Sequence, residues 1–199
     1  MRLIGFYDYT VILTYMSLIS GLVGMKAAFD GRFDLAIGCL MLSGFLDLFD
    51  GAVARTKKNR TEDEKNFGIQ LDSLCDMVCF GAFPAAFLYC SGVETMVGLA
   101  ILGLYVLCAL IRLAFFNVLE IRRQKTEGGC AKGYRGLPVT SISIILPFFY
   151  FMGRALPGHV TQVIYYAVPA VTALLFVWDF SMPKLDIGKY LFRSKAEAK

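Results

Sequence analysis

Six apolar stretches of about 20 residues recur along this chain of 199 residues, and they limit its possible folds more than any other feature. A helix of about 20 apolar residues is long enough to cross the hydrocarbon layer of a membrane. Lipid offers backbone groups no hydrogen-bonding partner, so each span must be a helix or a strand of a closed barrel, and unbroken apolar runs exclude the barrel. The predicted spans are 10–29, 33–49, 67–91, 95–118, 138–156 and 161–178.

The composition agrees with a membrane protein. Hydrophobic residues make up 57% of the chain and charged residues only 18%, which is more apolar surface than one soluble core could hide. The first apolar stretch lacks the basic start and small-residue cleavage site of a signal peptide, so we keep it as structure. We therefore predict an all-α, polytopic membrane domain over 1–182, with six transmembrane helices and a short interfacial segment at 1–9, followed by a cytoplasmic tail over 183–199.

Lysine and arginine collect in the loop after the second span, in the loop after the fourth span and in the tail. Short cytoplasmic loops are enriched in such residues, so we expect both termini and the two long loops on the cytoplasmic side. The formal net charge of +4 is then a topology signal that also attracts anionic lipid, and no nucleic-acid partner is expected. The basic residues of the two loops are Arg55, Lys57, Lys58, Arg60, Lys65, Arg122, Arg123, Lys125, Lys132 and Arg135.

Four aspartates stand at the expected cytoplasmic ends of the second and third spans. Asp47 and Asp50 are three residues apart, and Asp72 and Asp76 are four apart, so each pair shares one face of its helix. Charged groups at membrane depth are costly and need a reason. Any one of these aspartates taken singly is best explained by a nearby loop arginine or by the membrane interface, but four with matched spacing indicate a common site.

A hard divalent cation would satisfy four carboxylates that otherwise repel one another, and oxygen-only ligands suggest one or two Mg²⁺ or Mn²⁺ ions. Small residues beside the acids let a ligand approach the backbone, and one arginine is placed to bind a phosphate. This combination suits a pyrophosphate group, and a carboxylate not bound to metal could accept a proton from an attacking alcohol. The neighbouring residues are Gly51, Ala54, Arg55 and Gly68.

The segments DLFDGAVAR and GIQLDSLCD resemble the signature of the CDP-alcohol phosphotransferase family, D-x2-D-G-x2-A-R followed by G-x3-D-x3-D, at every fixed position. The loop of residues 56–67 between the two halves is longer than is usual for the signature. The resemblance implies a membrane enzyme, and a homodimer, in which Asp76 is the general base and can contact a second metal ion. It further implies metal ligation by Asp47, Asp50, Asp72 and Asp76, and a CDP pocket lined by Asp47, Gly51, Ala54, Arg55 and Gly68.

Three further stretches resemble the phosphatidylserine synthases within that family: LDSLCDMVCFGAFPA, IRLAFFNV and YRGLP, with Cys79 in place of a serine and Phe115 in place of an arginine. This resemblance implies that the phosphatidyl group of CDP-diacylglycerol is transferred to L-serine and that CMP is released. Arg112, Asn117 and Arg135 are the candidates to bind the acceptor or a phosphate. Alternatively, Arg112 pairs with one of the aspartates, and Arg135 belongs to an ordinary turn into a helix.

Two other functions remain open at this point. The acceptor could be glycerol phosphate or inositol phosphate, because Arg112, Arg122, Arg123 and Arg135 offer basic groups for a second phosphate. An ion transporter could also hold aspartates within a membrane, but its charges are expected near the midplane among broken helices. The acids of this chain are expected at one end, which favours the transferase.

Overall fold

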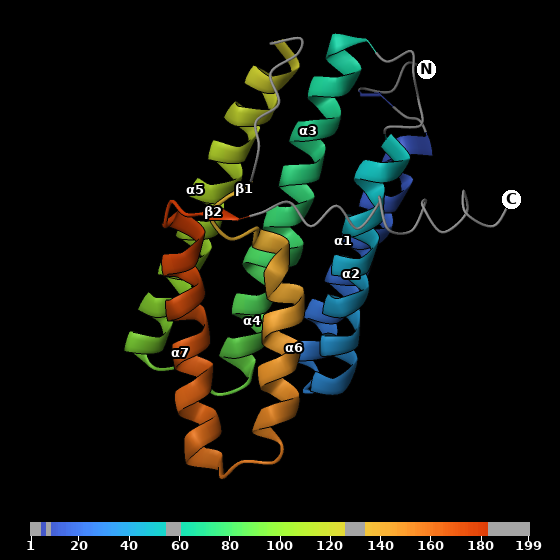
Figure 1. Cartoon of the computed structure of the whole chain (residues 1–199). Helices are drawn as coiled ribbons and strands as arrows, with labels where there is room; N and C mark the ends of the chain where they lie inside the picture. Colours follow the sequence, from blue (N-terminus) through green and yellow to red (C-terminus); the bar gives the residue numbers. More distant parts are fainter. Residues whose placement is uncertain (1–4, 7–8, 55–60, 126–133, 183–199) are drawn as a thin grey trace, which may run out of the picture.

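The computed structural model describes residues 5–6, 9–54, 61–125 and 134–182, and the side chains among them apart from those of 10, 51–54, 123–125, 134–135 and 181–182. Helices account for nearly all of this part of the chain (Figure 1). The long elements are α1 (Ile12–Phe29), α2 (Phe33–Ala54), α3 (Glu62–Asp76), α4 (Phe83–Cys90), α5 (Met96–Lys125), α6 (Ile142–Gly153) and α7 (Gly158–Val177). Short turns of 3-10 helix, η1 (Tyr9–Val11) and η3 (Val139–Ser141), precede α1 and α6.

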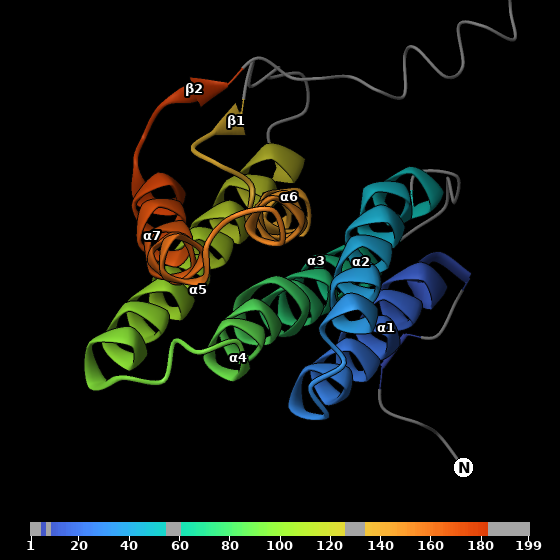
Figure 2. The ribbon, with the colours of Figure 1, turned by 90° about the horizontal axis from the view of Figure 1, so that it is seen from below.

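A single long helix runs through the middle of the bundle. It consists of α3, the π-helical turn η2 (Met77–Ala82) and α4, and it lies between the pair α1 and α2 on one side and the pair α5 and α7 on the other (Figure 2). Helix α6 packs against both α2 and α7. This arrangement places the helices that carry the predicted aspartates, α2 and α3, inside one bundle.

The bundle buries aromatic and aliphatic side chains at its centre and leaves many large apolar side chains exposed on its outside. Phe80, Phe83, Phe87 and Tyr105 are fully buried at its centre. Large apolar side chains on the outside are typical of a helix surface that faces lipid, where exposure of leucine or isoleucine carries no cost. Examples from five helices are Ile19, Leu48, Leu107, Ile144 and Val163.

Four of the helices are long and apolar enough to cross a membrane, within the part of the chain that the structure describes: Ile12–Phe29, Glu62–Cys90, Met96–Arg122 and Gly158–Val177. The apolar helix Val139–Gly153 is shorter, and α2 carries Asp34, Asp47 and Asp50 along its length. The expected all-helical membrane architecture is thus confirmed in its main feature. Four helices, and not all six predicted spans, reach the length and composition of a span.

The all-α prediction overlooked one small strand pair. Strand β1 (Tyr134–Arg135) pairs antiparallel with β2 (Ser181–Met182). The pairing ties the segment before α6 to the end of α7. Most of the predicted interfacial segment 1–9 and all of the predicted tail 183–199 fall outside the described residues.

Helix α3 begins at Glu62, five residues before the predicted span. Thr61 caps it: the Thr61 hydroxyl accepts a hydrogen bond from the Glu64 backbone N–H at 3.2 Å, and the Glu64 carboxylate accepts one from the Thr61 N–H at 2.9 Å. This reciprocal capping box satisfies two N–H groups that the first helical turn leaves without partners. The helix therefore starts in the polar segment, ahead of the apolar run.

Small side chains hold α1 close to α2. The Ser17 hydroxyl donates to the Ser43 carbonyl at 3.2 Å, and the Ser43 hydroxyl donates back to the Ser17 carbonyl at 2.9 Å. One turn further along, the Ser20 hydroxyl donates to the Cys39 carbonyl at 3.0 Å. Serine and glycine at such interfaces let helix backbones approach closely and add hydrogen bonds where lipid offers none. The spacing between α1 and α2 is therefore fixed near the middle of both helices.

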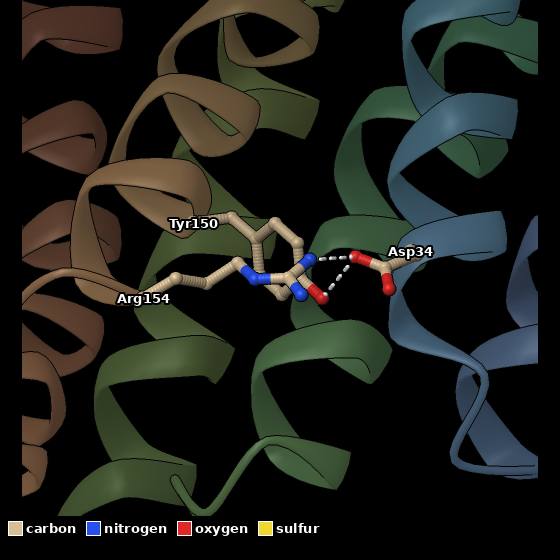
Figure 3. Close-up of polar contacts among 3 residues, drawn as sticks. All are labelled: Asp34, Tyr150 and Arg154. Carbon is tan, nitrogen blue, oxygen red and sulfur yellow. Dashed lines mark hydrogen bonds and ion pairs between the residues drawn. The ribbon is translucent and has the colours of Figure 1, made fainter.

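Helices α2 and α6 contact each other at two positions along α2. Near the middle, a Cβ atom placed on Gly44 would lie 2.1 Å from Oγ of Ser143, so only glycine allows this approach. At the start of α2, Oδ1 of Asp34 accepts a hydrogen bond from the Tyr150 hydroxyl at 2.8 Å and pairs with Nη1 of Arg154 at 2.6 Å (Figure 3). An exposed ion pair contributes about 0–1 kcal/mol, so this contact orients the two helix ends more than it stabilises them.

The π-helical turn η2 begins directly after Asp76. In an α-helix the Phe80 carbonyl would accept a hydrogen bond from the N–H of residue 84, but Pro84 has none. The hydroxyl of Tyr105, on α5, donates to this carbonyl, and both side chains are fully buried. Tyr105 thus supplies, from a neighbouring helix, a donor in place of the N–H that Pro84 lacks.

Replacing Tyr105 with phenylalanine should leave the Phe80 carbonyl without this donor at the same side-chain shape. We expect Tyr105→Phe to lower the free energy of unfolding by about 1–3 kcal/mol, the cost of an unsatisfied buried polar group. Thermal unfolding in detergent measures this change. Tyr89→Phe, at an exposed tyrosine on α4, is the matched control and should unfold like the parent protein; equal stability of the two variants would contradict the assignment.

Candidate functional site

The four predicted aspartates converge between α2 and α3. Asp47 and Asp50 lie in the last two turns of α2, and Asp72 and Asp76 lie in the last two turns of α3. Asp47, Asp50 and Asp72 each offer a carboxylate oxygen, and these three oxygens lie within 4.8 Å of one another. Two oxygens on opposite sides of one divalent ion are about 4–5 Å apart, twice the metal–oxygen distance. The three carboxylates are therefore spaced as ligands of a shared ion.

Asp76 lies beside the cluster of Asp47, Asp50 and Asp72. Its carboxyl lies within hydrogen-bonding reach of Asp47 and also interacts electrostatically with Asp50 and Asp72. The four-residue spacing from Asp72 places Asp76 one helical turn further into the bundle. Asp76 is thus beside the candidate ion position, where a carboxylate can contact a second group.

The carboxylates fit a cation by burial as well as by spacing. Asp50 is 8% exposed, and Asp47, Asp72 and Asp76 are half-buried. Among the described residues, Oδ1 of Asp72 is a buried side-chain oxygen that no hydrogen bond satisfies. A buried acceptor of this kind is costly unless it is bound. An all-oxygen donor set with one unsatisfied buried oxygen suits a hard ion such as Mg²⁺ or Mn²⁺.

A residue that the sequence motifs did not single out also reaches the site. The hydroxyl of Thr14, on α1, donates to Oδ2 of Asp50 at 3.1 Å. Thr14 is three residues before Ser17, and both are buried on the face of α1 that packs against α2. The signal that could have identified Thr14 is this run of small polar residues on one face of an apolar helix.

Arg112 is 6% exposed on α5, and its Nε donates to the Leu137 carbonyl at 3.2 Å. The segment it contacts bends at Gly136, whose φ of +72° lies in the left-handed region. A Cβ atom at Gly136 would lie 3.0 Å from the Trp178 carbonyl and 3.6 Å from Nε of Arg112. Two of the stretches singled out from the sequence, IRLAFFNV and YRGLP, therefore meet at one point.

Asn117 lies one and a half turns beyond Arg112 on α5 and bridges to α3. Its Oδ1 accepts a hydrogen bond from the Ser73 hydroxyl at 2.6 Å, and its Nδ2 donates to Oε1 of Gln70 at 3.3 Å. Ser73 follows Asp72 directly in the chain. Asn117 is thus linked to the helix that carries two of the aspartates, through partners that sequence reasoning did not identify.

The remaining predicted site residues are described only in part. Gly68 lies in α3, one turn before Asp72. Gly51 and Ala54 lie in the last turn of α2, and Arg135 lies in β1, but their surroundings are outside the described side chains. Arg55 is outside the described residues altogether.

An apolar helical bundle with four acids converging from two of its helices defines a membrane protein with a candidate divalent-metal centre. The chain belongs to the CDP-alcohol phosphatidyltransferase family, which it matches over residues 9–178. The family resemblance of the two aspartate segments is thereby confirmed. No solved structure gives a significant match to the chain.

Three curated relatives carry informative names. The archaetidylserine synthase of Methanothermobacter thermautotrophicus is 28% identical over 186 residues, covering 93% of this chain and 73% of that protein. The CDP-diacylglycerol–serine O-phosphatidyltransferase of Saccharomyces cerevisiae is 38% identical over 119 residues, covering 59% of this chain and 42% of that protein. The protein of the same name from Methanocaldococcus jannaschii is 32% identical over 138 residues, covering 69% of this chain and 59% of that protein. The chain thus matches about half the length of the latter two.

A divalent ion that binds the folded aspartate cluster and not the unfolded chain should stabilise the protein by mass action. Saturation at 100 times the dissociation constant gives about 2.7 kcal/mol. We expect Mn²⁺ or Mg²⁺ to raise the unfolding temperature of the purified protein in detergent. Asp72→Asn should lose most of this shift, whereas Asp63→Asn, at an exposed aspartate in the first turn of α3, should keep it. The same shift in all three proteins would mean that the ion binds elsewhere.

Proposed function

We propose that this chain transfers the phosphatidyl group of CDP-diacylglycerol to the hydroxyl of L-serine and releases CMP. The observation that carries the proposal is the convergence of Asp47, Asp50, Asp72 and Asp76 between α2 and α3. Family membership supports the CDP-linked donor, and the names of the relatives support serine as the acceptor. Such an acceptor needs one activated hydroxyl and a site for its carboxylate.

In this proposal Asp47, Asp50 and Asp72 hold one or two ions of Mg²⁺ or Mn²⁺. A bound ion would neutralise the negative charge that builds up on the diphosphate as CMP leaves. Gly51, Ala54, Arg55 and Gly68, together with Asp47, line the CDP pocket, with Arg55 toward the diphosphate. The small residues leave space for the nucleotide beside the helix backbones.

Asp76 is the proposed general base. As the serine oxygen bonds to the phosphorus that carries the lipid, Asp76 takes the hydroxyl proton, and the bond from that phosphorus to CMP breaks. Its position beside the three-carboxylate group supports the role, because the base must stand next to the phosphate, and from this position Asp76 can also contact a second ion. Asp47, within hydrogen-bonding reach, orients it.

Arg112, Asn117 and Arg135 are proposed to form the acceptor side of the site. Arg112 supports this role by its burial and by its hydrogen bond to the carbonyl of Leu137, two residues after Arg135 in the chain. A guanidinium pairs well with a carboxylate. Asn117 is proposed to act through its hydrogen bonds to α3, holding that helix at a fixed distance from the acceptor.

We further propose that all six predicted spans cross the cell membrane, with the active site and both termini on the cytoplasmic side, and that the protein is a homodimer. The helix order supports this topology: the short links at 30–32, 91–95 and 154–157 share one end of the bundle, and the end of α2, the start of α3 and the end of α5 lie at the other (Figure 1). Basic residues are frequent in the stretches of sequence that follow α2 and α5, as they are in cytoplasmic loops.

The proposed reaction predicts release of CMP from CDP-diacylglycerol when the purified protein is given L-serine and Mn²⁺ or Mg²⁺. Removal of the ion with EDTA should abolish it. Glycerol phosphate and inositol phosphate, tested under the same conditions, identify the acceptor within the same chemistry. If no alcohol of this panel releases CMP, the transferase function is wrong.

Asp76→Asn should remove the proton acceptor while keeping the size of the side chain. We expect kcat to fall by about 10²–10⁴ with binding of CDP-diacylglycerol little changed, because general-base catalysis contributes about that much. Asp34→Asn is the matched control: it makes the same change at an exposed position at the opposite end of α2. Turnover of Asp76→Asn close to that of Asp34→Asn would remove Asp76 from the role of base.

A further inference from the structure

Helix α1 contributes a side chain to the acidic cluster although it carries no acid there. Thr14 is 6% exposed and Asp50 is 8% exposed, and the hydrogen bond between them spans the α1–α2 interface. A threonine hydroxyl has one proton to donate, and an ionised carboxylate can only accept. The direction of the bond is therefore from Thr14 to Asp50.

The hydrogen bond restricts how the Asp50 carboxylate can turn. Threonine is branched at Cβ, so its side chain has few rotamers in a helix, and the rotamer of Thr14 directs the hydroxyl at Asp50. A residue that forms a hydrogen bond with a metal ligand, without binding the metal itself, orients that ligand. Loss of such a residue typically weakens metal binding 10- to 100-fold. Thr14 stands in this relation to Asp50.

The packing of α1 on α2 keeps Thr14 in register with Asp50. Ser17 and Ser43 exchange hydrogen bonds one turn away. These contacts fix the distance between the two backbones without touching any aspartate. Thr14 therefore connects the α1–α2 interface to the aspartate cluster through its hydrogen bond to Asp50.

We propose that Thr14 is a positioning residue that raises the affinity of the aspartate cluster for a divalent ion by orienting Asp50. This inference rests on the proposed function of the cluster as a metal site. It adds a third helix to that site, outside both segments of the family signature. The chemistry recognised is that of a hard divalent cation held by carboxylate oxygens.

Thr14→Val removes the hydroxyl at nearly constant shape, and Thr14→Ser restores a donor on a smaller side chain. The test is the Kd for Mn²⁺ of each purified protein in detergent, measured by loss of the electron paramagnetic resonance signal of free Mn²⁺. We expect Thr14→Val to raise the Kd about 10-fold or more. Thr14→Ser should bind Mn²⁺ nearly as the parent protein does.

Ser20→Ala is the matched control, because it removes a hydrogen bond across the same helix interface away from the acids. Its Kd for Mn²⁺ should equal that of the parent, and thermal unfolding of all variants reports any general loss of packing. An unchanged Kd in Thr14→Val, or an equal rise in Thr14→Val and Ser20→Ala, overturns the inference.

If the parent itself takes up no Mn²⁺, the metal site and the inference both fail. If the Kd values follow the expected order but the protein releases no CMP, the proposed function is wrong and the inference about Thr14 stands.

Discussion

Mutual repulsion of four carboxylates inside a low-dielectric bundle is the constraint on which this structure depends. Asp47, Asp50 and Asp72 offer oxygens within 4.8 Å of one another, and Asp76 adjoins them. Like charges at this distance oppose one another strongly where water is scarce. A fold that holds them together needs either a cation between them or rigid helices around them. The described contacts provide the rigidity, and the unsatisfied Oδ1 of Asp72 is an oxygen that a bound cation would satisfy.

The rigidity comes from polar contacts between helices, because lipid outside the bundle leaves little hydrophobic drive for helices to associate. Ser17 and Ser43 fix α1 to α2, and Asn117 fixes α5 to α3 through Ser73 and Gln70. Tyr105 adds a donor at the one place where Pro84 leaves the central helix without one. Each contact lies within a few turns of an aspartate, so the site is supported from two neighbouring helices, α1 and α5.

The sequence predicted the helices and the acids well because both depend on local spacing. Apolar runs predicted the helical architecture, in which four helices reach the length and composition of a membrane span. The three- and four-residue spacings placed each pair of aspartates on one face of its helix. It predicted helix ends less well: α3 starts at Glu62 because Thr61 and Glu64 form a capping box, a local signal that the apolar pattern hides. The turn η2 and the partner of Asp50 could not be predicted, since they depend on Tyr105 and Thr14, which meet their partners only after the helices pack.

The contact of Asp34 with Tyr150 and Arg154 has a mechanical meaning for the bundle. It fastens α2 to α6 at the end of α2 farthest from Asp47 and Asp50. Between this contact and the acids, Gly44 and Ser143 pack α2 closely against α6 a second time. The two ends of α2 are thus held independently, so a change at Asp34 loosens the outer end of the bundle and leaves the spacing beside the acids to Gly44 and Ser143.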